Sequence, residues 1–216
     1  MDLSNQAFPF GTAQIMDVGM ATVRAVRITY VGELGWELHI PVSQAVQVYE
    51  SLMKAGQDYR VVNAGHYAIN SLRLEKAYRA WGADISPDDT ALEAGLGFAV
   101  GWKKSSSFLG KAVLLEQKQA GLKRLLVTFV LEEPGPVLWG SEPIYRNGQA
   151  VGYTTSGSYG HSLKAGIGMG YVKCQNGVTP EYIREGRYEI NVSGRRVPAI
   201  PYLKAPFDPE RKKILT

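Results

Sequence analysis

Apolar and polar residues alternate in the first patterned stretch of the chain. The alternation runs through residues 21–30 (ATVRAVRITY), whose β-branched content is typical of a half-buried strand. Residues 32–35 (GELG) favour a tight connection, and residues 36–40 (WELHI) read as the returning strand. We therefore expect a β-hairpin whose turn carries acidic side chains.

Three later stretches repeat apolar residues at helical spacing instead. They predict helices over residues 43–59, 63–80 and 110–120, with glycines at or near the ends. Residues 92–100, between the second and third helices, are expected to lead into a further strand. The N-terminal part of the chain is thus predicted to mix helices and strands.

The second predicted helix carries a cluster of charged residues. Glu75 and Arg79 lie four positions apart, in the order that favours an ordinary ion pair on a helix surface. We interpret this face as a solvated one with its own ion pairs. In the functional alternative, Arg73 positions an acidic ligand.

Short β-rich runs separated by turn residues follow Lys123. Asn147-Gly148 between two such runs is the strongest local signal, since it favours a type I′ hairpin. Residues 153–169 are rich in glycine and serine but lack the glycine-lysine-serine ending of a phosphate-binding loop, so we interpret them as a turn between two barrel strands. The pattern predicts a small barrel or sandwich. The expected strands are residues 125–131, 142–146, 149–155, 168–172, 188–192 and 195–201.

The fold class predicted for the whole chain is α+β, with a division near residue 122. Residues 1–122 would form an α+β domain, and residues 123–216 a small all-β barrel domain. The 216 residues are 45% hydrophobic and 20% charged, which excludes a disordered or fibrous protein and supplies a sizeable core. A net charge of +4 is too small to indicate a nucleic-acid-binding surface.

Several classes of site and location are disfavoured by the composition. A single cysteine, Cys174, excludes an intrachain disulfide and, with only three scattered histidines, a structural zinc site. Those histidines, His39, His66 and His161, give no argument for a catalytic triad. The first ten residues resemble neither a signal nor a transit peptide, and no apolar run is long enough to span a membrane. We expect a soluble protein in a reducing compartment.

The predicted hairpin is the most suggestive candidate for binding chemistry. Glu33 and Glu37 lie on a glycine-shaped turn beside Tyr30 and Trp36. A carboxylate can accept two parallel N–H bonds and thus recognise the amino edge of a guanine or a pterin, while aromatic rings pack on its faces. The plainer alternative is a surface turn with solvated acids, and the residues alone favour it.

Several ordered motifs resemble the aminomethyltransferase (glycine cleavage T-protein) superfamily. The first is the tyrosine-x-glycine-glutamate signature, here Tyr30-x-Gly32-Glu33 followed by Gly35-Trp36-Glu37. Residues 204–209 (KAPFDP) and 79–81 (RAW) are most similar to the C-terminal folate-binding region of sarcosine and dimethylglycine dehydrogenases. The remaining blocks are residues 70–76 (NSLRLEK), 92–96 (LEAGL), 108–111 (FLGK), 152–157 (GYTTSG) and 168–172 (GMGYV).

The resemblance implies a tetrahydrofolate site and assigns residues to it. Tyr30 would pack against the folate, Glu37 would hold the amino edge of the pterin, and Leu38 and His39 would continue that wall. Phe98 stands where the dimethylglycine branch has a tyrosine, so a stacking ring is kept and a hydroxyl is lost. No catalytic or metal-binding residue is assigned, because the family's catalytic aspartate would lie before residue 1.

The same resemblance implies a larger parent protein. The first lobe of the folate-binding domain and the FAD-binding portion would also precede residue 1, so we expect a C-terminal piece. Its function would be capture of the one-carbon unit released by oxidation of an N-methyl amine. The alternatives are a non-catalytic subunit similar to the pyruvate dehydrogenase phosphatase regulatory subunit and a stand-alone folate carrier.

We expect a folate ligand, no nucleic-acid or membrane partner, and either self-association or binding to the missing N-terminal part. The location would be the mitochondrial matrix in a eukaryote and the cytoplasm in a bacterium.

Overall fold

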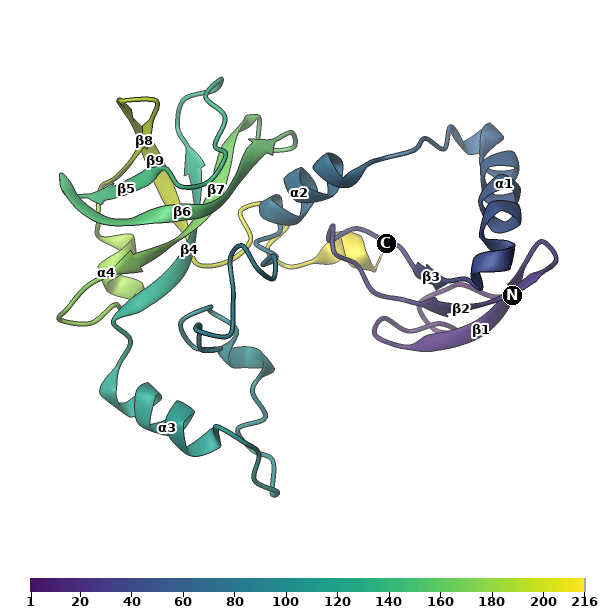
Figure 1. Ribbon diagram of the computed structural model, residues 1–216, viewed down its shortest axis with the longest axis horizontal. Coiled ribbons are helices and arrows are strands. Elements are labelled where there is room, and N and C mark those ends of the chain that lie inside the picture. Colours follow the sequence, from purple (N-terminus) through teal and green to yellow (C-terminus); the bar gives the residue numbers. More distant parts are fainter. Residues whose placement is uncertain (216) are drawn as a thin grey trace. The chain divides into compact units, whose positions relative to one another are not determined.

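The computed structural model describes residues 1–215, which form two compact units (Figure 1). The first, called the sheet unit below, comprises Met1–Ile69 and the C-terminal residues from Glu210 onward. The second, the barrel unit, comprises Asn70–Pro209. The predicted mixture of helices and strands with a β-barrel is confirmed. The division into residues 1–122 and 123–216 stays a prediction.

The sheet unit is built on a three-stranded antiparallel sheet in the order β1-β2-β3. Strand β2 (Ala21–Val26) pairs with β3 (Glu37–His39), so the predicted hairpin exists. Its connection is longer than expected and takes up residues 27–36, because the Thr29 hydroxyl accepts bonds from the amides of Val31 and Gly32. This local side-chain turn replaces further rungs of the ladder.

Strand β1 (Ala13–Val18) was not predicted; the sequence pattern suggested only a polar lead-in over this region. It pairs with the whole of β2 and occupies the edge of the sheet. One face of the sheet packs on helix α1 (Ala45–Ala55), which contributes the fully buried Val48. The other members of this core are Ala21, Val23, Met16, Val18, Leu38 and Ile40.

Helix α2 (His66–Glu75) begins in the sheet unit and ends in the barrel unit. It stops five residues before the predicted end at Ala80, because Ala77 adopts a left-handed φ of 54° and the Tyr78 amide turns back to bond the Arg73 carbonyl. Helix α1 likewise ends at Ala55 rather than Tyr59, and a short 3₁₀ helix follows it.

The segment between α2 and the barrel is mostly irregular. Residues 92–100, expected to approach a strand, instead form turns and a short 3₁₀ helix, because the Leu96 amide bonds back to the Ala91 carbonyl and Gly95 takes a φ of 68°. Helix α3 (Lys111–Ala120) agrees with the prediction and has no buried residue. In Figure 1 it projects away from the barrel.

Six strands close into an antiparallel barrel in the order β4-β7-β6-β5-β8-β9. All six expected strands are present, and a short helix, α4 (Pro180–Arg184), precedes β8. The predicted Asn147-Gly148 turn joins β5 to β6, with positive φ at both residues. The strands are β4 (Arg124–Leu131), β5 (Pro143–Arg146), β6 (Gln149–Gly160), β7 (Ala165–Lys173), β8 (Tyr188–Val192) and β9 (Arg195–Tyr202).

The glycine-rich stretch 153–169 contains the predicted turn between two barrel strands, but the turn is much shorter than expected. Most of it lies in β6 and β7, and only residues 161–164 connect them. Glycine is needed there because the chain packs too closely for a side chain: a Cβ at Gly170 would lie 2.5 Å from the Tyr153 carbonyl oxygen, and one at Gly166 would lie 2.4 Å from the Pro136 carbonyl oxygen. These glycines leave the barrel interior to larger side chains from other strands.

The barrel unit has two apolar clusters. The interior contains Phe129, Leu138 and Ile144, all fully buried. Outside, Leu74 of α2 packs on Ile167 and its neighbours on β4 and β7, so α2 covers part of the barrel wall. Because the helix packs on the barrel, several of its charged residues are buried.

Candidate functional site

The face of the sheet opposite α1 is exposed and carries most of the predicted binding residues. We call it the open face and define it by Ala13, Ile15 and Asp17 of β1, Thr22 and Arg24 of β2, and Glu37 and His39 of β3. All seven are exposed. Alternation of side chains along each strand places them on one side, since their neighbours in sequence face the α1 core.

Glu37 is the first residue of β3, and its carboxylate is available to a ligand. The side chain is exposed and makes no hydrogen bond or ion pair within residues 1–215. Val26 is directly opposite it in the register. An exposed carboxylate on a strand can accept two N–H bonds from a planar ligand edge without breaking any contact of the protein.

Arg24 is a member of this face that sequence reasoning did not single out. The register places it between Ile15 and His39, and diagonally across from Glu37. Its guanidinium also makes no hydrogen bond or ion pair among the described residues. The alternating pattern showed that Arg24 faces solvent, but only the pairing of β2 with β3 shows that it neighbours Glu37 and His39.

Tyr30 and Leu38 have different surroundings from Glu37. Tyr30 lies on the connection between β2 and β3, with 39% of its surface exposed. Leu38 is half-buried and packs against the α1 core, on the side of the sheet away from Glu37. Leu38 therefore holds β3 on the core, and its predicted contribution to a ligand wall stays a prediction.

Phe98 belongs to the barrel unit and is 80% exposed. It lies in the 3₁₀ helix Gly97–Ala99, which is tied down by a hydrogen bond of 2.8 Å from the Trp102 indole to the Gly97 carbonyl. An exposed ring on a fixed turn can stack on a planar ligand. Its assignment to a binding site stays a prediction.

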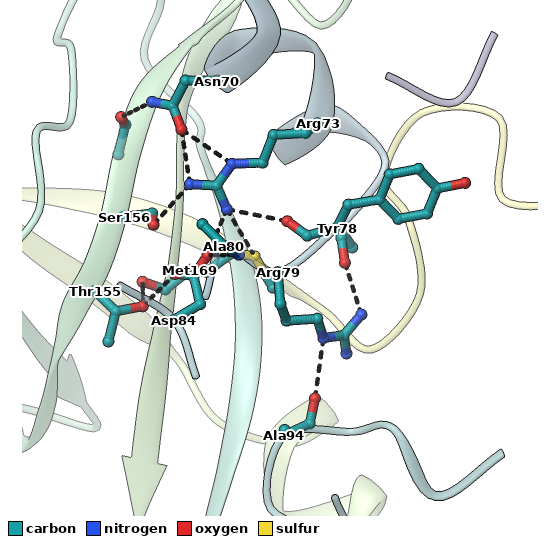
Figure 2. Close-up of polar contacts among 12 residues, drawn as sticks. Asn70, Arg73, Tyr78, Arg79, Ala80, Asp84, Ala94, Thr155, Ser156 and Met169 are labelled. Atoms are coloured by element: carbon teal, nitrogen blue, oxygen red, sulfur yellow. Dashed lines mark hydrogen bonds and ion pairs between the residues drawn. The ribbon is translucent and has the colours of Figure 1, made fainter. Parts of the chain in front are cut away.

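Arg73 is the centre of a buried polar cluster (Figure 2). Its Nε and one terminal nitrogen donate to Asn70 Oδ1 at 2.9 and 2.7 Å, and the latter nitrogen also donates to Ser156 Oγ at 2.7 Å. The other terminal nitrogen donates to the Tyr78 carbonyl at 3.0 Å and forms an ion pair with Asp84. All five donors of the guanidinium are used, so none remains for an acidic ligand.

Asp84 completes this cluster from the other side. Its carboxylate accepts bonds from the Thr155 hydroxyl at 2.5 Å and from the Ala80 amide at 2.9 Å. The side chains of Arg73 and Asp84 are only 3% and 0% exposed. No sequence signal marked Asp84, since its network depends on Thr155, which lies 71 positions away on a barrel strand.

The interpretation of this helix face as solvated is wrong. Arg73, Glu75 and Lys76 are 2%, 1% and 6% exposed. The Glu75 carboxylate accepts bonds from the Ser162 amide, the Ser162 hydroxyl and the Leu163 amide at 2.7–3.0 Å. Arg79 lies beyond the end of the helix, and its guanidinium donates to the Ala94 and Ala77 carbonyls. Arg73 and Glu75 are therefore buried and attach the C-terminal part of α2 to the barrel wall.

A second ionic group joins the loop before α3 to strand β4. Arg124 bonds Asp89 at 3.0 Å and Glu93 at 3.1 Å. Burial would raise the carboxyl pKa values, but bonds from Ser86 and Thr90 and the charge of Arg124 hold the pKa of both Asp89 and Glu93 below its ordinary value. Burial and the nearby Asp89 raise the pKa of Tyr171. These groups act in structure, since none of them is a predicted site residue.

The barrel unit also has a surface groove that lies apart from the Arg73 and Arg124 groups described above. The groove, of about 810 Å³, runs over the barrel between the β5–β6 turn, Arg187, Glu189 and residues 198–201, and contains no predicted site residue. No group of His, Cys, Asp and Glu within residues 1–215 could hold a metal ion. Nor does any helix in this part of the chain have the length and apolarity needed to cross a membrane.

Comparison with known proteins accounts for the two parts of the chain separately. The GCVT N-terminal domain model matches residues 1–104. The glycine cleavage T-protein C-terminal barrel domain model matches residues 124–208, which include all six strands of the barrel.

The chain spans less than a quarter of the length of three mitochondrial relatives that it matches. The chain is 44% identical over 99% of its length to sarcosine dehydrogenase, mitochondrial, of Homo sapiens, and spans 23% of that protein. It is 40% identical over 92% of its length to dimethylglycine dehydrogenase, mitochondrial, of Homo sapiens, and spans 22% of it. It is also 39% identical, over 89% of its length, to pyruvate dehydrogenase phosphatase regulatory subunit, mitochondrial, of Mus musculus, of which it spans 23%.

A solved structure supports the same assignment. The glycine cleavage system aminomethyltransferase T from Bartonella henselae superimposes with a TM-score of 0.72 at 29% identity, over 86% of this chain and 49% of its own. The three-stranded sheet lies within the residues matched by the first domain model, and the closed barrel lies within those matched by the second. The chain belongs to the aminomethyltransferase (glycine cleavage T-protein) family.

Proposed function

We propose that this chain is the tetrahydrofolate-binding C-terminal region of a sarcosine/dimethylglycine dehydrogenase-like flavoprotein. The observation that carries the proposal is the uncommitted Glu37 carboxylate on the open face, within the residues that the GCVT N-terminal domain model matches. The longer protein would oxidise an N-methyl amine with FAD bound in another part. The present chain would bind the folate that captures the released carbon.

The residues of the sheet unit suit a pterin. Glu37 can accept two N–H bonds from the 2-amino-pyrimidinone edge, and Tyr30 offers a half-exposed ring at the other end of the same connection. Arg24, diagonal to Glu37, can donate to a carbonyl of the same ring. His39 extends this polar row, and Leu38 anchors its strand on the core.

This chain's contribution would be binding and orientation. When bound, tetrahydrofolate supplies the nucleophilic amines that take up the one-carbon unit. Glu37 and Arg24 fix the in-plane direction of the ring, and Tyr30 limits its tilt. Neither proton transfer nor covalent catalysis is assigned to a residue of this chain. The gain in rate would come from holding a reactant in one geometry.

Titration calorimetry with 5-formyltetrahydrofolate, a chemically stable folate, tests the proposal. We expect the wild-type chain to bind and Glu37→Ala to weaken binding at least about tenfold, or ~1.4 kcal/mol. Glu50→Ala is the matched control, because Glu50 is an exposed carboxylate on α1, outside the open face. Equal binding by the wild type and Glu37→Ala would remove Glu37 from the site. Binding by neither would contradict a folate site in this chain alone.

A second candidate is a non-catalytic regulatory subunit of the same family. It is favoured by the similarity to the phosphatase regulatory subunit, which matches 89% of the chain, against 92% for dimethylglycine dehydrogenase. For this function we expect the chain not to bind folate. We expect it instead to co-purify with a phosphatase catalytic subunit. The coding sequence upstream separates the two: intact FAD-linking residues and the catalytic aspartate favour the enzyme.

Association with another polypeptide surface is part of the proposal. Besides the open face, α1 and the turn before it expose Val42, Val46 and Tyr49, at 93%, 69% and 49%. Exposed apolar groups of this kind drive either self-association or docking of the rest of a longer protein. Light scattering after size exclusion should show a dimer or larger species; a clean monomer would count against it. In a eukaryotic cell we expect the mitochondrial matrix, and in a bacterium the cytoplasm.

A further inference from the structure

Arg27 is a fully buried arginine at the base of the connection that carries Tyr30. It is 1% exposed and is the largest side chain of the chain that is buried to this extent. One terminal nitrogen donates to the Phe8 carbonyl at 2.6 Å, and the other donates to Asn5 Oδ1. Its guanidinium also lies over the Trp36 ring, 5.5 Å from the ring centroid. These contacts join the two ends of the connection to the N-terminal segment.

The register explains why Arg27 and Trp36 meet. Val26 and Glu37 form the last rung of the β2–β3 ladder, so Arg27 and Trp36 occupy the next position on the two strands. Alternation places both side chains on the core side and leaves Glu37 on the open face. The backbone is fixed there as well, because Arg27 exchanges bonds of 2.9 and 2.8 Å with Thr12 and Gly11.

This arrangement is expensive in stability. Arg27 forms no ion pair within residues 1–215, and its Nε and the Trp36 indole nitrogen are buried without an acceptor there. A buried cation without a counter-charge, together with unpaired donors, destabilises a fold relative to apolar packing. A leucine or methionine would fill this space at lower cost. The planar fork of arginine instead specifies one geometry, because it must reach two oxygens and a ring face together.

We propose that Arg27 is a positioning residue that holds the Tyr30 connection and Glu37 in binding geometry. The clamp consists of Arg27, Trp36, Phe8 and Asn5. Phe8 is fully buried and packs on Trp36 with ring centroids 6.3 Å apart, so the N-terminal segment supports the site from behind. Trp36 precedes Glu37 directly, and Tyr30 follows Arg27 by three residues. The ligand part of this inference rests on the proposed function; the clamp itself does not.

Hydrogen exchange of the ligand-free chain tests the clamp. We compare Arg27→Lys and Arg27→Met with Lys54→Met, which removes an exposed charge from α1. Exchange at residues 28–36, which include the bonded amides of Val31 and Gly32, should quicken at least about tenfold in both Arg27 variants. Amides of β4–β9 should keep the wild-type rate, which shows that the protein has folded. Unchanged exchange at residues 28–36, or full rescue by Arg27→Lys, would overturn the clamp.

Binding of 5-formyltetrahydrofolate to a double-mutant cycle tests the positioning role. Arg27→Lys should weaken binding about tenfold in the wild-type background, but by less than about twofold when added to Glu37→Ala, because it acts through Glu37. Additive losses would indicate general destabilisation and overturn the role. No binding by the wild-type chain would overturn the proposed function and this role with it, while the exchange result would still decide the clamp.

Discussion

The charged side chains of α2 that pack on the barrel are buried and bonded, whereas Glu37 and Arg24 on the open face of the sheet unit are exposed and uncommitted. Arg73 and Glu75 use their donors and acceptors in bonds to the helix itself, to the barrel wall and to the loops around it. Glu37 and Arg24 have no protein partner among residues 1–215. Similar residue types in one chain thus serve attachment in one unit and remain available for a ligand in the other. Availability, and not the mere presence of charge, separates a candidate site from a structural network.

The largest expected effect comes from breaking the barrel unit's network. Arg73→Met leaves Asp84 buried, charged and without its ion-pair partner, so we expect a loss of about 3–5 kcal/mol in the free energy of unfolding. Urea denaturation measures it. Arg184→Met is the control, because its pair with Glu181 is exposed and should be worth well under ~1 kcal/mol. Equal stability of the two variants would mean that the buried network contributes nothing special.

A smaller loss is expected where the backbone of the barrel unit packs closely. A Cβ at Gly157 would lie 2.3 Å from the Leu138 carbonyl carbon, so Gly157→Ala must displace the loop that Leu138 anchors. Overpacking of this kind costs about 1–3 kcal/mol. Gly65→Ala is the control, since nothing lies within 4 Å of its Cβ position. A loss as large in the control would refute the steric explanation.

Acid should weaken the barrel unit by about 1 kcal/mol through the Arg124 group. The pKa of Asp89 and of Glu93 is lowered in the folded state. Their stabilisation is therefore complete above the ordinary carboxyl pKa of about 4 and is lost as the pH falls through the lower folded values. Thermal melts of the wild type and Asp89→Asn from pH 6, about two units above that value, to pH 3, about one unit below it, measure it. The variant should lose less on acidification, and identical pH dependence would contradict the assignment.

The smallest effect is expected on the open face. Glu37→Gln removes a charge that contacts nothing in the described chain, so the free energy of unfolding should change by less than about 0.5 kcal/mol. The same urea denaturation measures it. A loss comparable to that of Arg73→Met would show that Glu37 is structural, and the contrast between the two units would fail.

Sequence reasoning succeeded where a short segment determines its own structure. The six barrel strands and the Asn147-Gly148 turn follow from local alternation and turn chemistry. The family motif singled out Glu37, and the strand alternation exposes it as a ligand-binding residue requires. Sequence reasoning missed β1, an edge strand that is recognised only from its pairing with β2.

The errors arose where distant segments meet. The charged face of α2 looked solvated because its partners, such as Ser156 and Ser162, lie more than 80 positions away in the sequence. The glycines of β7 looked like a turn because their need, close packing inside a closed barrel, is a property of the assembled sheet. The sequence did not single out Arg27, because the Phe8 carbonyl and the Asn5 side chain that it bonds lie 19 and 22 positions away.

The order of the strands has a consequence for synthesis of the protein. Strand β4 pairs with β7 and with β9, so the barrel cannot close until Tyr202 is available. The sheet unit includes the residues from Glu210 onward, and Asn5 bonds the Leu215 carbonyl. The barrel can therefore close only after Tyr202 has been synthesised, and the sheet unit can be completed only after the residues from Glu210 onward have been synthesised. The strands β1, β2 and β4 are thus made well before the segments that complete their units.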